Sequence, residues 1–162
     1  MSQSLTIALR AEPARDGHDE PARLRAVFTN TSDRALALTF WWTRRLRVVD
    51  AQGREVAPGP GPVLPCGVAE DWTVLAPGER HEHNEPLACT QPAGRSEPIG
   101  WSYALAPGTY RVRLFHEAPP AHGFTQSAPH PDAFRGRVES DEVTITVAAP
   151  PERPGLLRRL FG

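Results

Sequence analysis

Two histidines in the middle of the chain have a spacing that suits metal binding. In His81-Glu82-His83 the imidazoles are two residues apart, and side chains at i and i+2 of a strand point to the same face. A working site needs a third and often a fourth ligand. The sequence offers these further candidates: Glu85, Cys89, His116 and His122. Because only tertiary contacts would bring them to the pair, we favour a solvated polar edge strand. A small metal-dependent enzyme centred on His81 and His83 is the alternative.

Other signatures of catalysis are missing from the sequence. It has no Gly-x-Ser-x-Gly elbow, Walker loop, dinucleotide fingerprint or His-Glu-x-x-His motif. Nothing near Cys66 in the sequence activates its thiol as a nucleophile. Cys66 and Cys89 are the two cysteines of the sequence. In a reducing cytosol we expect them to be free thiols and not a disulfide. We therefore expect a protein that is not an enzyme and that holds no cofactor and no metal.

Trp41 is a candidate anchor for a partner. Trp42 continues the core-facing alternation of Phe40, so Trp41 falls on the opposite face of the same strand. An outward tryptophan beside Arg44 and Arg45 has the composition favoured in the centre of protein interfaces. A neighbouring strand or a long loop would cover this residue equally well.

A long insertion, residues 118–137, contains two phenylalanines and several prolines. Loops beyond about 12–15 residues are uncommon in compact domains unless they are functional or disordered. His122, Phe124 and Phe134 are the side chains that we expect to bind a partner or to pack on the sandwich, and both outcomes stay open. The insertion precedes the last expected strand.

The C-terminal residues 150–162 form a second unit, after a first domain of residues 1–149. Prolines at 150, 151 and 154 break the last strand. Leu156, Leu157, Leu160 and Phe161 make one apolar stripe if this tail is helical. So short a helix needs a docking surface. The tail therefore packs on its own sandwich or inserts into a partner's groove, and we favour the partner.

Alternating apolar and polar residues dominate the rest of the chain, with turn-forming residues roughly every 8–12 positions. The alternation predicts strands at residues 5–9, 24–28, 36–42, 46–48, 54–56, 71–75, 80–87, 110–114 and 143–147. Residues 80–87 are expected at a sheet edge or in a connection. This pattern is typical of an all-β, immunoglobulin-like antiparallel β-sandwich of about seven to eight strands.

The segment Leu-Ala-Pro-Gly occurs twice, at residues 75–78 and 105–108. Proline followed by glycine suits a type II turn, because proline sets the first central φ and glycine accepts a positive φ at the second. In the second copy Tyr110 follows two residues later. This arrangement resembles the tyrosine corner of immunoglobulin-type sandwiches, in which the hydroxyl donates to nearby backbone.

The order of these pieces resembles the bacterial BsuPI-type intracellular proteinase inhibitor domain, an immunoglobulin-like module. The resemblance extends over about residues 24–114 and is carried by Phe28-Thr29-Asn30-Thr31-Ser32, Leu36-Ala37-Leu38-Thr39-Phe40, Val49-Asp50-Ala51-Gln52-Gly53-Arg54-Glu55-Val56, Leu75-Ala76-Pro77-Gly78-Glu79 and Leu105-Ala106-Pro107-Gly108-Thr109-Tyr110-Arg111-Val112. It implies the fold, and suggests proteinase inhibition as one form of a non-enzymatic protein-interaction function.

Charge and hydropathy exclude other classes of partner. The formal net charge of the 162 residues is −1, so no overall field attracts nucleic acid or an anionic membrane. No stretch approaches the roughly 18–20 apolar residues that span a bilayer, and the first residues do not resemble a secretory signal. We expect a cytoplasmic protein that binds another protein, with its oligomeric state left open.

Overall fold

Ten β-strands form in the described part of this computed structural model, which comprises residues 4–13, 22–40, 44–58, 72–86, 103, 105–118 and 130–149. No helix long and apolar enough to cross a membrane occurs among these residues. The strands are β1 (Leu5–Pro13), β2 (Ala22–Asn30), β3 (Leu36–Thr39), β4 (Arg44–Asp50), β5 (Glu55–Val56), β6 (Trp72–Leu75), β7 (Arg80–Pro86), β8 (Gly108–Glu117), β9 (Arg137–Glu139) and β10 (Val143–Val147).

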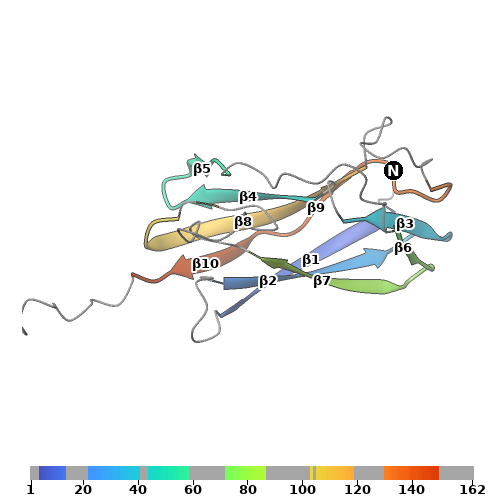
Figure 1. Cartoon of the computed structure of the whole chain (residues 1–162), viewed down its shortest axis with the longest axis horizontal. Coiled ribbons are helices and arrows are strands. Elements are labelled where there is room, and N and C mark those ends of the chain that lie inside the picture. Colours follow the sequence, from blue (N-terminus) through green and yellow to red (C-terminus); the bar gives the residue numbers. More distant parts are fainter. Residues whose placement is uncertain are drawn as a thin grey trace, which may run out of the picture.

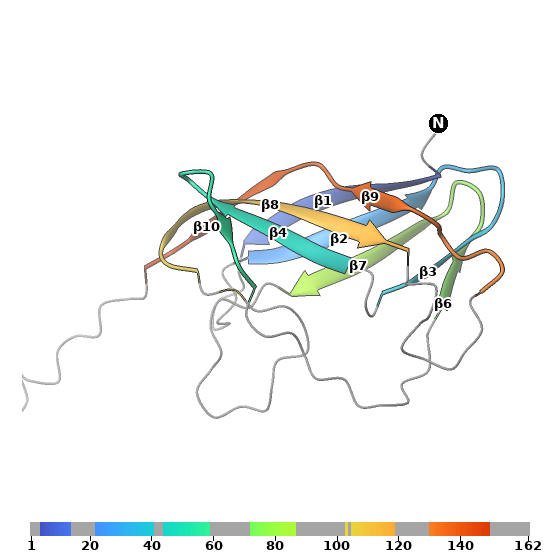
Figure 2. The same cartoon turned by 90° about the horizontal axis from the view of Figure 1, so that it is seen from above.

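The strands pack in two layers, which confirms an all-β sandwich (Figure 1). One sheet has the order β1-β2-β7, and the other has the order β10-β8-β4-β5 with β9 also paired to β8. A short two-stranded sheet, β3-β6, lies at one end of the molecule (Figure 2). Adjacent strands pair antiparallel in all three sheets.

The core lies between the two larger sheets and follows the predicted alternation. Alternate residues are buried from Leu5 to Leu9 in β1 and from Leu24 to Asn30 in β2, and β8 buries Tyr110, Val112 and Leu114 while Arg111 and Arg113 point outward. The apolar core is completed from both layers by these residues: Leu5, Ile7, Leu9, Leu24, Ala26, Phe28, Leu46, Val48, Val138 and Ile145. Period-two alternation therefore assigns the inner faces of β1, β2, β4, β8 and β10 correctly.

Strand β3 departs from this pattern, since all four of its residues are buried. Its second neighbour comes from the insertion: the Ala37 amide donates to the Asp132 carbonyl (2.8 Å), and the Phe134 amide donates to the Ala37 carbonyl (2.9 Å). The Phe134 side chain is 5% exposed and belongs to the core. The last part of the predicted loop thus packs in the sandwich, and its end becomes β9.

The two Leu-Ala-Pro-Gly segments have different backbones. In the first, Gly78 has a φ of 77° and the Glu79 amide donates to the Ala76 carbonyl (3.0 Å), as a type II turn requires. In the second, Gly108 has a φ of 157°, close to extended, and begins β8. The turn prediction is therefore wrong for the second copy. The predicted tyrosine contact is present there, because the Tyr110 hydroxyl donates to the Ala106 carbonyl (2.8 Å).

Asn30 at the end of β2 is fully buried, and both the nitrogen and the oxygen of its side-chain amide make hydrogen bonds. Its Nδ2 donates to the carbonyls of Arg34 (2.8 Å) and Leu75 (2.9 Å). Its Oδ1 accepts from the Ser32 amide (2.9 Å) and the Ser32 hydroxyl (2.7 Å). A buried polar side chain is costly unless its donors and acceptors are paired, and here they all are.

The backbone of Asn30 ties the same residue to the first Leu-Ala-Pro-Gly turn. The Asn30 amide donates to the Glu79 carbonyl (3.0 Å), and the Gly78 amide donates to the Asn30 carbonyl (2.9 Å). One residue therefore joins the end of β2, the turn toward β3, the end of β6 and the start of β7.

Replacing Asn30 by alanine should destabilise the protein strongly, because the buried hydrogen bond to the Leu75 carbonyl is lost together with the bonds that Asn30 makes to Arg34 and Ser32. We expect the free energy of unfolding to fall by roughly 2–4 kcal/mol, measured by urea denaturation. Ser32→Ala removes only a half-buried hydroxyl and should cost about 1 kcal/mol. Equal losses for the two variants would contradict the central place given to the amide.

Candidate functional site

The predicted histidine pair lies on β7, at the edge of the sheet β1-β2-β7, which confirms the edge-strand interpretation. His81 is opposite Phe28 and His83 is opposite Ala26, so both imidazoles point toward the interior side of the sheet. The Phe40 ring stacks on both of them, with ring centroids 4.9 Å from His81 and 5.1 Å from His83.

The described side chains place no third metal ligand beside this pair. The two imidazole centroids are 6.3 Å apart, whereas two histidines on one tetrahedral zinc have ring centres about 5 Å apart. No group of three or more metal-binding side chains occurs within the described ranges. His116 is 1% exposed and packs against Phe28 (5.6 Å between ring centroids). The pair thus extends an aromatic cluster at the edge of the core.

The structure places two of the predicted partner-binding side chains. Arg45 is exposed on β4, as predicted, whereas Phe134 is buried, which favours packing over recognition for that residue. Arg44 is the first residue of β4, and its side chain is not described. The other predicted positions lie outside the described residues: Trp41, His122, Phe124, Leu156, Leu157, Leu160 and Phe161, as do Cys66 and Cys89.

The outer face of the sheet β10-β8-β4-β5 carries a row of arginines, of which the sequence singled out Arg45 alone. Arg45 and Arg47 come from β4, Arg111 and Arg113 from β8, and Arg137 from β9, and all five are exposed. The strand register puts Arg47 directly opposite Arg113. Like charges in directly opposite positions destabilise a sheet. The same opposition occurs on the other sheet between Arg10 and Arg25, where Glu12 and Glu82 pair with Arg25 at 3.1 and 3.0 Å.

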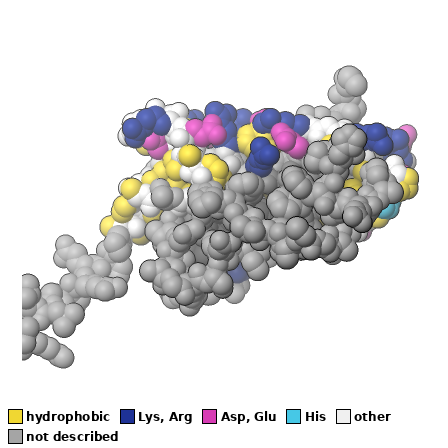
Figure 3. Space-filling model, turned by 45° about the horizontal axis from the view of Figure 1, so that its top comes forward, with side chains coloured by type: hydrophobic (Ala, Val, Ile, Leu, Met, Phe, Trp, Pro, Cys, Tyr) yellow, Lys and Arg dark blue, Asp and Glu magenta, His cyan; other side chains and the backbone are white. Residues whose placement is uncertain are grey.

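Three glutamates partly neutralise the centre of this face. Glu142, just before β10, contacts both Arg111 (3.4 Å) and Arg113 (3.4 Å), Glu55 on β5 contacts Arg47 (2.9 Å), and Glu139 on β9 lies 3.9 Å from Arg113. The three arginine side chains are still 44–51% exposed. Figure 3 shows arginine and acidic side chains next to one another on the described surface.

One end of this face is more tightly organised. The Arg137 guanidinium lies over the Phe115 ring, 4.4 Å from its centroid, and contacts Glu117 (3.2 Å) and Glu139 (3.1 Å). Phe115 faces outward between β4 and β9 yet is only 8% exposed. Arg137 thus serves as a cover for an outward phenylalanine.

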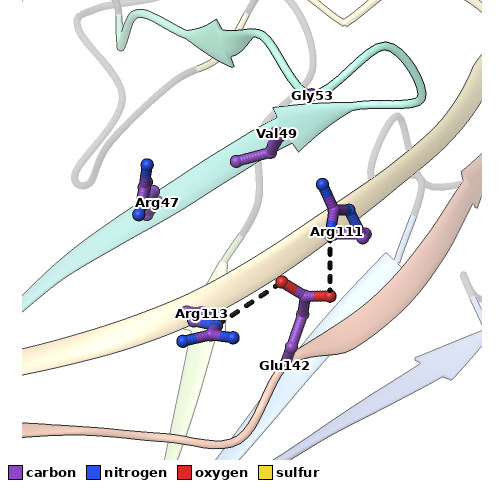
Figure 4. Close-up of a pocket in the computed structure, with 6 residues that line it drawn as sticks. All are labelled: Arg47, Val49, Gly53, Arg111, Arg113 and Glu142. Atoms are coloured by element: carbon purple, nitrogen blue, oxygen red, sulfur yellow. Dashed lines mark hydrogen bonds and ion pairs between the residues drawn. The ribbon is translucent and has the colours of Figure 1, made fainter.

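A shallow hollow of about 250 Å³ lies at the centre of the face, lined by Arg47, Val49, Gly53, Arg111, Arg113 and Glu142. Figure 4 shows the arginines of β4 and β8 around it, with Glu142 reaching between Arg111 and Arg113. Each guanidinium has five N–H donors in a planar fork that matches carboxylate and phosphate groups. The hollow can therefore hold an anionic group.

The hairpin between β4 and β5 shapes one wall of this hollow. The Asp50 carboxylate accepts from the amides of Gln52 (2.9 Å) and Arg54 (2.8 Å). The hydrogen bond from the Arg54 backbone amide is the main cause of the lowered pKa of Asp50. Gly53 has a φ of 82°, which a residue with a side chain rarely adopts. The turn therefore fixes where β4 ends and β5 returns.

Tyr103 holds β4 in place from the core side. Its hydroxyl donates to the Leu46 carbonyl (2.6 Å), one residue before Arg47. Its side chain is 2% exposed. Burial raises the pKa of Tyr103 to about 12, and the Glu55 carboxylate adds to the rise.

Comparison with known proteins assigns no family. No family model matches the chain, and no curated protein matches it. A solved structure, target SoR45 of the Northeast Structural Genomics Consortium, is similar with 14% sequence identity and a TM-score of 0.40, over 94% of this chain and 92% of that one. At this TM-score neither fold nor function is inferred from the likeness.

Tyr103 should make the protein lose stability at alkaline pH. Above about pH 10 the unfolded chain releases the tyrosine proton, while the folded protein keeps it until about pH 12. The free energy of unfolding therefore falls by about 3 kcal/mol between these pH values. The sequence has no lysine, so few other side chains titrate in this range.

Urea unfolding from pH 8 to 12 measures this slope. Tyr103→Phe should be less stable by about 1 kcal/mol at pH 8, because the Leu46 carbonyl loses its donor, and should show a much smaller alkaline slope. Tyr110→Phe is the matched variant, and it should keep the slope because Tyr103 remains. An unchanged slope in Tyr103→Phe would contradict the assignment.

Proposed function

We propose that this chain is a non-enzymatic protein-interaction module built on an immunoglobulin-like sandwich. The strand orders β1-β2-β7 and β5-β4-β8-β10 correspond to the A-B-E and C′-C-F-G arrangement of such domains. The Tyr110 hydroxyl bond to the Ala106 carbonyl, at the start of the strand in the F position, also supports this topology.

The exposed arginine row on the outer face of β10-β8-β4-β5 is the observation that carries the proposal. Arginine is enriched at protein interfaces, and its fork binds carboxylates with fixed geometry. These arginines stand on paired strands, so little ordering is needed before a partner binds. Glu55 and Glu142 offset the Arg47–Arg113 opposition in part, and a further anion beside Arg113 would offset more of it. The favoured partner surface is therefore acidic.

The sequence adds further contacts and a setting to this proposal. Trp41, His122 and Phe124 would extend the surface through loops, and the apolar tail of residues 156–161 would provide a second contact. The resemblance to the BsuPI-type domain suggests an inhibited proteinase as one form of partner. The cytoplasm is the compartment proposed with it, since two cysteines are too few for the disulfide framework of a secreted domain.

Partner capture from the native cells tests the proposal. Arg111→Glu with Arg113→Glu should remove a co-purifying protein that the unchanged chain retains, because both guanidinium forks are replaced by carboxylates. Arg10→Glu on β1, an exposed arginine on the opposite outer face, is the matched variant and should retain it. A chain truncated after residue 149 measures how much the tail contributes to partner capture. Equal capture by all four proteins, or capture by none, would contradict the proposed surface.

The inhibitor form has its own test. Purified protein should slow the hydrolysis of a peptide substrate by a proteinase from the same cells, with an end point at one equivalent of protein. Replacing Trp41 by alanine should weaken this inhibition if the loops make the contact. No inhibition of any proteinase in the cell extract would remove this form and leave the interaction module.

A further inference from the structure

The guanidinium groups around the hollow defined above use only part of their hydrogen-bonding capacity. Glu142 contacts Arg111 and Arg113 at 3.4 Å each, longer than the roughly 2.7–2.9 Å of a strong charge-assisted bond. Arg47 faces them from β4 and is held by Glu55 on its other side. The Glu142 carboxylate is therefore a loosely held anion among three arginines.

We propose that this hollow is a binding site for one carboxylate of an acidic side chain on the partner, with Glu142 as an internal stand-in for it. The inference rests on the proposed function. The partner's carboxylate enters between Arg47 and Arg113 and accepts hydrogen bonds from the guanidinium N–H groups of both. The ion pairs of Arg111 and Arg113 with Glu142 weaken as it binds.

The charge of the hollow matches a carboxylate better than a phosphate. Arg47, Arg111 and Arg113 contribute three positive charges, while Glu142 and the paired Glu55 contribute two negative ones, and Glu139 lies 3.9 Å from Arg113 but closer to Arg137 (3.1 Å). At most one positive charge remains, which a single carboxylate neutralises. A phosphate group carries about −1.5 to −2 charges at pH 7 and would leave an excess of negative charge.

The strand pairing gives a second reason for a ligand at this place. Arg47 and Arg113 occupy directly opposite positions, where an arginine and a glutamate would be more stable. Arg10 and Arg25 are also directly opposite on the other sheet, but Arg25 is held there by Glu12 (3.1 Å) and Glu82 (3.0 Å), whereas the carboxylates beside Arg113 are 3.4 and 3.9 Å away. A carboxylate between Arg47 and Arg113 would remove the repulsion.

The chain's own C-terminal residues do not match the hollow in charge. Residues 148–162 follow β10 and contain Glu152 as their one acid, together with Arg153, Arg158 and Arg159. A segment with a net positive charge would be repelled by three arginines. The occupant is therefore a partner segment rich in aspartate or glutamate.

A labelled acidic peptide tests the site directly. Fluorescein-labelled hexaglutamate is titrated with the full chain, and fluorescence anisotropy gives the dissociation constant. Arg111→Gln with Arg113→Gln should weaken binding roughly tenfold or more, since charge-assisted hydrogen bonds are lost. Glu142→Gln should strengthen it about threefold to tenfold, because the stand-in is neutralised. Circular dichroism and thermal unfolding verify that each variant is folded.

Matched controls separate the site from general charge. Glu12→Gln removes a carboxylate that pairs with Arg25 on the opposite outer face, and it should leave the affinity nearly unchanged. Hexaglutamine should not bind. Inorganic phosphate should compete less well than free acetate at equal ionic strength. Better competition by phosphate would overturn the carboxylate assignment and indicate a phosphate site.

The outcomes distinguish this inference from the proposed function. Equal strengthening by Glu142→Gln and Glu12→Gln, or full affinity in the arginine double variant, would overturn the site even if the chain still captures a partner. Hexaglutamate binding with the predicted variant effects, without partner capture from cells, would uphold the site and contradict the interaction function. If Glu142→Gln does not fold, Glu142→Ala replaces it in the titration, and the same strengthening of hexaglutamate binding is expected.

Discussion

The buried Asn30 side chain is the constraint on which one end of the sandwich depends. Its amide has no access to water, so its donors and acceptors must be met by backbone from two separate turns. This requirement fixes how β2 ends and where the first Leu-Ala-Pro-Gly turn lies. At the other end Tyr110 and Asp50 close their own turns through side-chain oxygens. Polar groups at the strand ends thus define the frame around an apolar core.

The outer face of the sheet β10-β8-β4-β5 follows a different principle. The inner residues of β4 and β8 fix the register through the core, and this register then places Arg47 against Arg113 on the solvent side. The sandwich tolerates this opposition because Glu142 and Glu55 screen it from either side. The site is therefore a consequence of the core together with the choice of arginine at outward positions.

The sequence predicts the strands well and the site poorly, for physical reasons. Period-two alternation identifies the buried faces of Ile7, Phe28 and Val112 without knowledge of neighbours. It gives no register, so the meeting of Arg47 with Arg113 and Glu142 is invisible until β4, β8 and β10 are paired. The sequence does not decide whether Phe134 binds a partner or packs in the core, because its burial depends on pairing with Ala37, almost a hundred residues earlier. The type II turn predicted for the second Leu-Ala-Pro-Gly segment is wrong because its glycine begins β8.

The central claim is that three specific arginines on one sheet face bind an acidic partner. The most direct measurement follows the arginine Nε–H resonances by NMR as hexaglutamate is added to the full chain. The account predicts saturable shifts for Arg47, Arg111 and Arg113, with Arg10 and Arg23 of the opposite sheet nearly unmoved. Shifts of similar size for all five, or shifts confined to the opposite sheet, would contradict it.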